Sequence, residues 1–235
     1  MRICVISPNT SRDFLEGQKR ELKDLPYVGV VGITKGPESV ECYYDDVLAS
    51  PYIVELAEQA ERRAFDAVVI SCFFDPGLKA AREVVSIPVT SAGESALHMA
   101  CSLGERIGIV TTVTNSIPVI HHLVKSLGLE SHLATVRAAS LGVLELDASE
   151  KTVNALLKES LSAIKEAGSD VIVLGCTGMA EVATALQDKI RAANHDVPVV
   201  DPLRAAIQWA EALVKLKLRH SRASYPRPPS KIRTK

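Results

Sequence analysis

The segment AVVISC at residues 67–72 recurs as VIVLGC at residues 171–176, and this recurrence decides the fold. The two segments lie 104 residues apart, since 171 − 67 and 176 − 72 both equal 104. Each begins with a continuously apolar run of the kind that forms a buried strand of a parallel sheet. Each also ends in a cysteine, so the repeat pairs Cys72 with Cys176.

The repeat extends over most of the chain. The further matched pairs are RICVISPNT (2–10) with RIGIVTTVT (106–114) and VGVVGIT (28–34) with HLATVRA (132–138), both at an offset of 104, and IPVTSAGESALHMA (87–100) with VPVVDPLRAAIQWA (197–210) at an offset of 110. A constant offset through three strands predicts two similar lobes related by a pseudo-twofold axis. Such an axis makes equivalent strand ends face each other, so both cysteines should line one cleft between the lobes.

Short β-branched runs alternate with longer amphipathic stretches, which predicts an α/β fold. The expected strands are residues 3–6, 28–34, 67–71, 88–90, 107–111, 133–137, 171–174 and 198–200. Residues 52–63 and 152–167 have apolar side chains at helical spacing. We therefore expect two pseudo-twofold-related Rossmann-like lobes, each with a mainly parallel four-stranded sheet flanked by helices, and an active site in the interlobe cleft.

The amino-acid composition restricts the classes of binding partner. The 235 residues are 47% hydrophobic and 23% charged with a formal net charge of −1, which is ordinary for a soluble globular protein and favours neither a nucleic-acid nor a membrane partner. No apolar run approaches the roughly 18 residues of a membrane span, and the N-terminus lacks the pattern of a signal peptide. We expect a cytoplasmic protein.

The five cysteines predict free thiols, because an odd count without a secretory pattern argues against a disulfide framework. No cysteine or histidine group has zinc-ligand spacing, so we expect no metal. Three of the cysteines (Cys4, Cys42 and Cys101) are interpreted as small buried hydrophobic residues.

Cys72 and Cys176 each end a strand and precede an expected helix start. A thiol at a helix N-terminus lies in positive potential, which favours the thiolate. Two such groups on opposite faces of a planar carbanion can remove a proton and return one, which inverts the carbon. Without a cofactor the carbanion must be stabilised by fixed donors. The candidates are backbone N–H groups after each cysteine and the side chains of Asn9, Thr10, Ser11 and Thr112.

Three motifs resemble the Asp/Glu/hydantoin racemase superfamily, most closely its hydantoin and allantoin racemases. They are SPNTS (7–11), SCFFDPGLKAARE (71–83) and LGCTGM (174–179). The resemblance implies two α/β lobes and a cofactor-independent reaction in which Cys72 and Cys176 are the two bases. The substrate-binding residues that we expect are Asn9, Thr10, Phe73, Phe74, Thr112, Thr177 and Gly178.

The resemblance also implies lobe boundaries, because the final helix of such proteins, here around residues 203–216, crosses back to the N-terminal lobe. We expect a first lobe of residues 1–95 plus 205–219, a second lobe of residues 96–204, and a basic flexible tail at 220–235. A contact within an oligomer is the alternative role of the tail. We expect a homo-oligomer of unspecified size.

The expected substrate is a small molecule with an acidic C–H beside a carbonyl, first a 5-substituted hydantoin or allantoin. An aspartate- or glutamate-type amino acid is the alternative, in which Glu94 or Asp75 would face the ammonium group, although Asp75 followed by Pro76 is typical of a helix cap. The repeat aligns Glu94 with Arg204, and we interpret these two residues as an ion pair. More distant alternatives are a maleate isomerase or arylmalonate decarboxylase relative and a non-catalytic small-molecule sensor.

Overall fold

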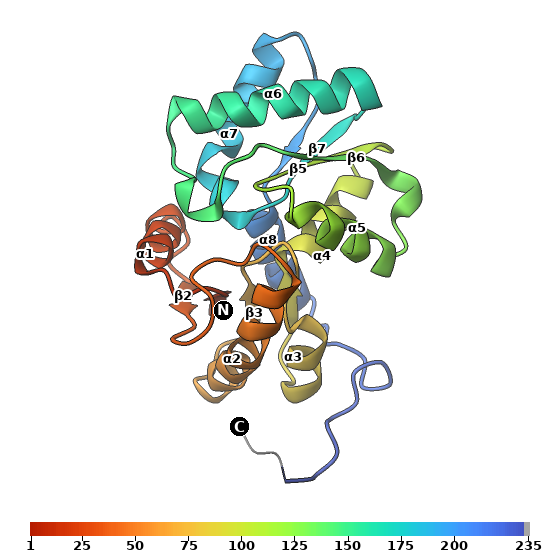
Figure 1. Ribbon diagram of the computed structural model, residues 1–235. Helices are drawn as coiled ribbons and strands as arrows, with labels where there is room; N and C mark the ends of the chain where they lie inside the picture. Colours follow the sequence, from red (N-terminus) through yellow and green to blue (C-terminus); the bar gives the residue numbers. More distant parts are fainter. Residues whose placement is uncertain (233–235) are drawn as a thin grey trace.

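Two four-stranded parallel sheets form the framework of the protein, seen in a computed structural model that describes residues 1–232 (Figure 1). The first sheet has the order β2-β1-β3-β4 and consists of β1 (Ile3–Ser7), β2 (Val28–Gly32), β3 (Ala67–Ile70) and β4 (Val89–Ser91). The second has the order β6-β5-β7-β8 and consists of β5 (Ile107–Thr111), β6 (Leu133–Ala138), β7 (Val171–Leu174) and β8 (Val199–Val200). The identical strand orders confirm the expected α/β fold with two similar lobes.

The central strands are buried because helices cover both faces of each sheet. Every residue of β1, β3, β5 and β7 is buried. This explains why these strands are continuously apolar, and why a 104-residue repeat was visible in them.

The two sheets differ in one register. Ile3 pairs with Val28 in the first sheet, so the repeat places His132 opposite Ile107 in the second. The structure instead pairs Ile107 with Leu133 and shifts the register again before Gly108. His132 ends a 3₁₀ turn (Glu130–His132) that precedes β6. The alignment of the second strand of each lobe is therefore displaced by one or two residues.

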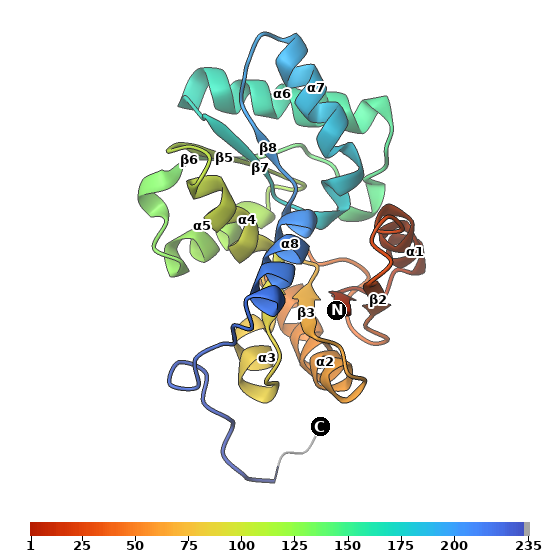
Figure 2. The same ribbon diagram turned by 180° about the vertical axis from the view of Figure 1, so that it is seen from behind.

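Helices surround the sheets, with α4 and α8 lying between them (Figures 1 and 2). The helices are α1 (Arg12–Glu21), α2 (Tyr43–Arg62), α3 (Leu78–Val84), α4 (Ala92–Cys101), α5 (Ser116–Ser126), α6 (Glu150–Ala167), α7 (Ala183–Ala192) and α8 (Pro202–Lys215). α8 packs on β3, β4 and α4, in the first lobe and at its border. The exact lobe boundaries stay a prediction. No helix within residues 1–232 is long and apolar enough to cross a membrane.

Helix α2 begins nine residues before the expected start at residue 52, and Pro51 lies inside it. Proline removes one backbone hydrogen bond, here to the carbonyl of Val47. Val47 is exposed, so water can satisfy that carbonyl. The helix therefore extends further toward the N-terminus than the apolar spacing of residues 52–63 indicates.

The chain after α8 differs from the flexible tail expected at residues 220–235. His220 accepts a hydrogen bond from the Val89 N–H at 2.8 Å. The guanidinium of Arg222 donates to carbonyl oxygens at the end of α3, including that of Glu83 at 3.1 Å. Tyr225 hydrogen-bonds Arg82 at 3.2 Å. These contacts anchor the part of the tail from His220 to Arg227, since cations favour helix C-termini; residues 233–235 lie outside the described residues.

Candidate active site

Cys72 follows β3 by two residues and is 8% exposed. The expected helix start does not directly follow it, because α3 begins only at Leu78 after a turn that ends in Gly77 with φ of +68°. A left-handed φ there favours glycine. The predicted stabilisation of a Cys72 thiolate by a helix N-terminus is therefore wrong, and the N–H of Phe74 within the turn is the donor that favours the charged sulfur.

Cys176 occupies the position that was predicted for it. It caps a 3₁₀ helix (Thr177–Val182), and its sulfur accepts a hydrogen bond from the Gly178 N–H at 3.4 Å. The turn follows directly on β7, with Gly175 between them. The two thiols thus come from equivalent strand ends of the two lobes.

Both cysteines line one cleft, as the repeat predicts. The residues around it come from strand ends, from α1 and α5, and from two loops: Pro8, Asn9, Phe14, Val40, Ser71, Cys72, Phe73, Phe74, Thr112, Ser116, Val143, Gly175, Cys176 and Thr177. The space between these side chains is about 20 Å³, which is room for about one water molecule, so the side chains around it must move apart to admit a substrate.

Burial holds both thiols in the neutral form. It raises the pKa of Cys176 to about 11, although the hydrogen bond from the Gly178 N–H opposes this shift. Burial also raises the pKa of Cys72 well above the usual range for a thiol. The Phe74 N–H opposes this shift, and negative charge on Cys176 adds to it. Because charge on one sulfur disfavours charge on the other, the cleft favours one thiolate at most.

Three polar side chains in the cleft are available as donors. The side-chain oxygen of Asn9 accepts from the Ser11 N–H at 3.2 Å, which leaves its NH₂ group without a partner among the described residues. The hydroxyls of Thr112 and Ser116 likewise form no hydrogen bond within the described part of the chain. Such preorganised donors can stabilise negative charge on a carbonyl oxygen.

Two expected binding residues do not line the cleft. Thr10 uses both its N–H and its hydroxyl on the carbonyl of Pro37, at 2.9 and 3.2 Å, so it anchors a loop. Gly178 lies on a neighbouring groove, where a Cβ would meet Phe14 and Leu146 at 3.0 Å. Its contribution is the N–H that faces the sulfur of Cys176.

Several cleft residues were missed. Phe14 and Ser116 lie at the starts of helices that follow strand ends, and this position is the one signal that pointed to them. Val40 lies in a loop and Val143 begins a short 3₁₀ helix (Val143–Glu145), and neither has a motif or periodicity. The N–H of Val143 donates to the carboxylate of Glu41 at 2.8 Å, so the two segments meet across the lobes.

Asp75 is a helix cap, but of another helix than the sequence suggests. Its carboxylate accepts from the N–H groups of Gly93 and Glu94, both at 2.8 Å, in the first turn of α4. The backbone of Asp75 has a φ of 55°, which turns the side chain back toward α4. Asp75 thus ties the Cys72 turn to the helix between the sheets.

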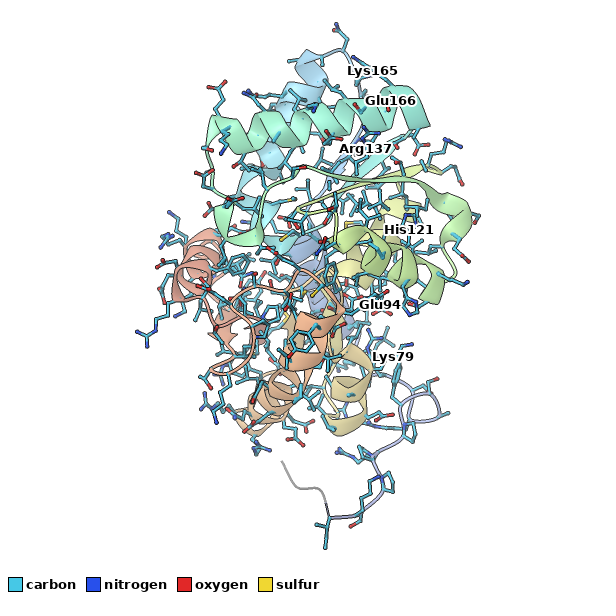
Figure 3. All side chains as sticks on the ribbon, in the orientation of Figure 1. Lys79, Glu94, His121, Arg137, Lys165 and Glu166 are labelled. Carbon is cyan, nitrogen blue, oxygen red and sulfur yellow. The ribbon has the colours of Figure 1, made fainter. Side chains whose placement is uncertain are left out.

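Glu94 lies at the junction of the lobes (Figure 3) and forms an ion pair with Arg82. The pairing with Arg204 that the repeat suggested is wrong, because Arg204 pairs with Asp24 at 3.0 Å. Glu94 and Asp75 are both absent from the cleft lining, so neither is placed to receive an ammonium group there. Within residues 1–232, no cluster of three or more His, Cys, Asp or Glu side chains is arranged to hold a metal ion.

Known proteins match both the sequence and the fold. A family model described as Asp/Glu/Hydantoin racemase matches residues 3–210. The hydantoin racemase of Paenarthrobacter aurescens is 35% identical over 238 residues, which cover 98% of this chain and 99% of the relative. Allantoin racemase from Klebsiella pneumoniae superposes with a TM-score of 0.92 at 34% identity, covering 100% of this chain and 96% of that one. Allantoin racemase from Pseudomonas fluorescens gives a TM-score of 0.89 at 32% identity, with full coverage of both chains.

These matches agree with the α/β fold and the repeated strand order. The chain belongs to the Asp/Glu/hydantoin racemase family and is a racemase.

Proposed function

We propose that this protein racemises 5-substituted hydantoins, allantoin among them, by a cofactor-independent two-base mechanism in which Cys72 and Cys176 are the bases. The observation that carries the proposal is that equivalent strand ends bring both thiols to one cleft beside unpartnered donors. The hydantoin and allantoin racemases that resemble the chain support the substrate class.

The reaction balances without an added reagent. One cysteine, as thiolate, takes the proton from C5 of the ring, and the electron pair moves onto the C4 carbonyl oxygen. Asn9, Thr112 and Ser116 donate to that oxygen. The opposite thiol then gives its proton to C5 from the other face. The first cysteine ends as a thiol and the second as a thiolate, ready for the reverse reaction.

The cleft favours a neutral ring over an amino acid. Among the described residues that line it, none is acidic. A free ammonium group brought into this buried space lacks a counter-charge, which costs several kcal/mol per ion. A hydantoin carries no formal charge, and its carbonyl oxygens match the available donors. Arylmalonate decarboxylases use a single cysteine. The second cysteine in this cleft therefore favours a racemase over a decarboxylase.

The proposal is tested with single enantiomers of hydantoins bearing ureido, benzyl and methylthioethyl groups at C5. Racemisation is followed by circular dichroism and proton exchange at C5 by NMR in D₂O, each against an enzyme-free blank. We expect Cys72→Ser and Cys176→Ser to lower the rate of racemisation by roughly 10²–10⁴-fold, the usual contribution of acid–base catalysis.

Cys101→Ser is the matched control, because this cysteine lies in α4 outside the cleft. It should racemise at the wild-type rate. Near-wild-type racemisation by either Cys72→Ser or Cys176→Ser would rule out the two-base mechanism.

A further inference from the structure

A buried glutamine on an otherwise solvated helix has no role in the chemistry above. Gln18 lies on α1, most of whose residues are exposed or half-buried, yet it is only 3% exposed itself. Burying an amide is costly unless it is hydrogen-bonded. Its side-chain nitrogen donates to the hydroxyl of Ser71 at 2.6 Å, whereas its side-chain oxygen is buried without a partner among the described residues, so Ser71 is the contact that holds this amide in place.

Ser71 immediately precedes Cys72, and it also reaches the other lobe. Its carbonyl oxygen accepts a hydrogen bond from the hydroxyl of Thr177 at 3.2 Å. Thr177 immediately follows Cys176. All three side chains are at most 3% exposed. One chain of hydrogen bonds therefore runs from α1 through the neighbour of one thiol to the neighbour of the other.

The Thr177 hydroxyl has one proton, and Ser71 receives it. Thr177 is therefore not a free donor to a substrate, although it lines the cleft. The repeat aligns Thr177 with Phe73, which has no hydroxyl, so the first lobe offers no equivalent bond from that position. The comparable bond in the second lobe, from Thr111 to the Gly175 carbonyl at 3.4 Å, stays within that lobe.

We propose that Gln18, Ser71 and Thr177 form a positioning network that sets the separation and orientation of the Cys72 and Cys176 thiols. The inference rests on the two-base function proposed above. Proton transfer between a thiol and a carbon needs reacting atoms about 3–3.5 Å apart, and a misplacement of about 1 Å can cost 10²-fold in rate. Two bases on separate lobes must both meet this condition at once, and the bond from the Thr177 hydroxyl to the Ser71 carbonyl connects the residues next to the two thiols.

The network predicts a signature that general destabilisation does not produce. When the two thiols stand too far apart, the first still removes the C5 proton, but the second returns one more slowly. The carbanion then persists while the first thiol exchanges its proton with D₂O and returns deuterium to the original face. The rate at which the starting enantiomer takes up deuterium at C5 therefore rises relative to the rate of inversion. A smaller folded fraction lowers both rates equally and leaves their ratio unchanged.

The experiment measures this ratio of C5 exchange with retention to inversion, together with kcat and KM, on one hydantoin enantiomer. Thr177→Val removes the hydroxyl at similar volume, and Gln18→Met removes the amide at similar length. We expect both variants to raise the ratio, with Thr177→Val raising it at least about fivefold and lowering kcat by roughly 10- to 100-fold with little change in KM.

Thr177→Ser, which keeps the hydroxyl, should restore the wild-type ratio. Ser160→Ala is the control for loss of a buried hydroxyl elsewhere, since the Ser160 hydroxyl donates to the carbonyl of Leu156 within α6. It should keep the wild-type ratio.

A wild-type ratio in both Thr177→Val and Gln18→Met would overturn the network, whatever their rates. That outcome differs from a failure of the proposed function, in which Cys72→Ser or Cys176→Ser would keep the wild-type rate of racemisation.

Discussion

At the scale of single residues, the cleft presents two cysteine thiols, which we propose as the bases, in an environment that suppresses ionisation. Burial raises the pKa of Cys176 to about 11 and that of Cys72 well above its usual range. A thiolate is nevertheless the form that removes a proton. The donors at each sulfur, the N–H groups of Phe74 and Gly178, offset part of the penalty. The free enzyme therefore contains little of its reactive form at neutral pH.

This sets the direction of the pH dependence. Below the pKa of an acid, its ionised fraction rises tenfold per pH unit, and kcat/KM reports groups of the free enzyme. After subtraction of the enzyme-free blank, kcat/KM should rise about tenfold per unit between pH 6 and pH 8. Stopped assays with one hydantoin enantiomer measure it. A flat profile over this range would mean that a thiolate already exists at pH 6, contrary to the burial of both sulfurs.

The two cysteines to which we assign the chemistry were the easiest cleft residues to find from the sequence. Cys72 and Cys176 stand out because each ends a continuously apolar strand segment and because the repeat aligns one with the other. Val40 and Val143 could not be found in this way, because a loop and a single 3₁₀ turn that meet across a cleft leave no periodic signal. Thr10 does not line the cleft for a related reason: strand-end polar residues also serve to anchor loops.

At the scale of elements, the first turn of α4 packs directly on the Cys72 turn. Asp75 accepts two backbone N–H groups of α4, and Gly93 lies against the backbone of Phe73. Local capping rules assign Asp75-Pro76 to the helix that follows. They cannot detect that the carboxylate of Asp75, at a positive φ, caps α4, which begins 17 residues later at Ala92. A similar limit applies to Pro51, whose helix tolerates it because the affected carbonyl lies on an exposed turn.

Gly93→Ala tests the contact between these elements. A Cβ there would lie 2.1 Å from the Phe73 carbonyl oxygen, so the turn that holds Cys72 must move. We expect racemisation to fall at least about tenfold, because small displacements of catalytic groups are costly. Enzyme assays and thermal unfolding on the same samples measure the effect.

Gly128→Ala is the matched control. Gly128 has a φ of +72° and no atom within 4 Å of an added Cβ. The substitution should cost about 1–2 kcal/mol of stability through backbone strain alone and leave activity intact. Equal loss of activity in both variants would mean that the Gly93 contact acts only through stability.

At the scale of the whole molecule, two lobes of one design pack on α4 and α8, and the tail is anchored on the first lobe. The strand orders and the shared cleft follow from the repeat, so the sequence predicts the architecture well. The tail was not predictable, because its contacts depend on single side chains such as His220 and Arg222. A composition rich in proline, serine and basic residues is equally typical of a disordered segment.

The tail anchor should weaken in acid. Burial lowers the pKa of His220 to about 4, and its neutral ring accepts the Val89 N–H. The unfolded state therefore binds more protons than the folded state between pH 6.5 and 4, so the contribution of His220 is full above pH 6.5 and is lost as the pH falls through this window. Truncation after Leu218 should lower Tm by about 2–4 °C at pH 7.5, for a loss of about 1 kcal/mol. Calorimetry should show this difference shrinking toward pH 4.

His220→Gln keeps an acceptor that does not titrate. In that background the effect of truncation should stay constant over the same pH range. A pH-independent truncation effect in the unsubstituted protein would show that His220 does not hold the tail.

The two thiols occupy unlike surroundings: one is held in an irregular turn, the other caps a 3₁₀ helix. Enantiomers with a single stereocentre have equal free energies, so detailed balance requires the same kcat/KM in both directions. Any local difference between the lobes that changes kcat/KM in one direction must therefore change it equally in the other. The asymmetry of the site can therefore appear only in the separate values of kcat and KM, with the enantiomer that binds more tightly also turning over more slowly.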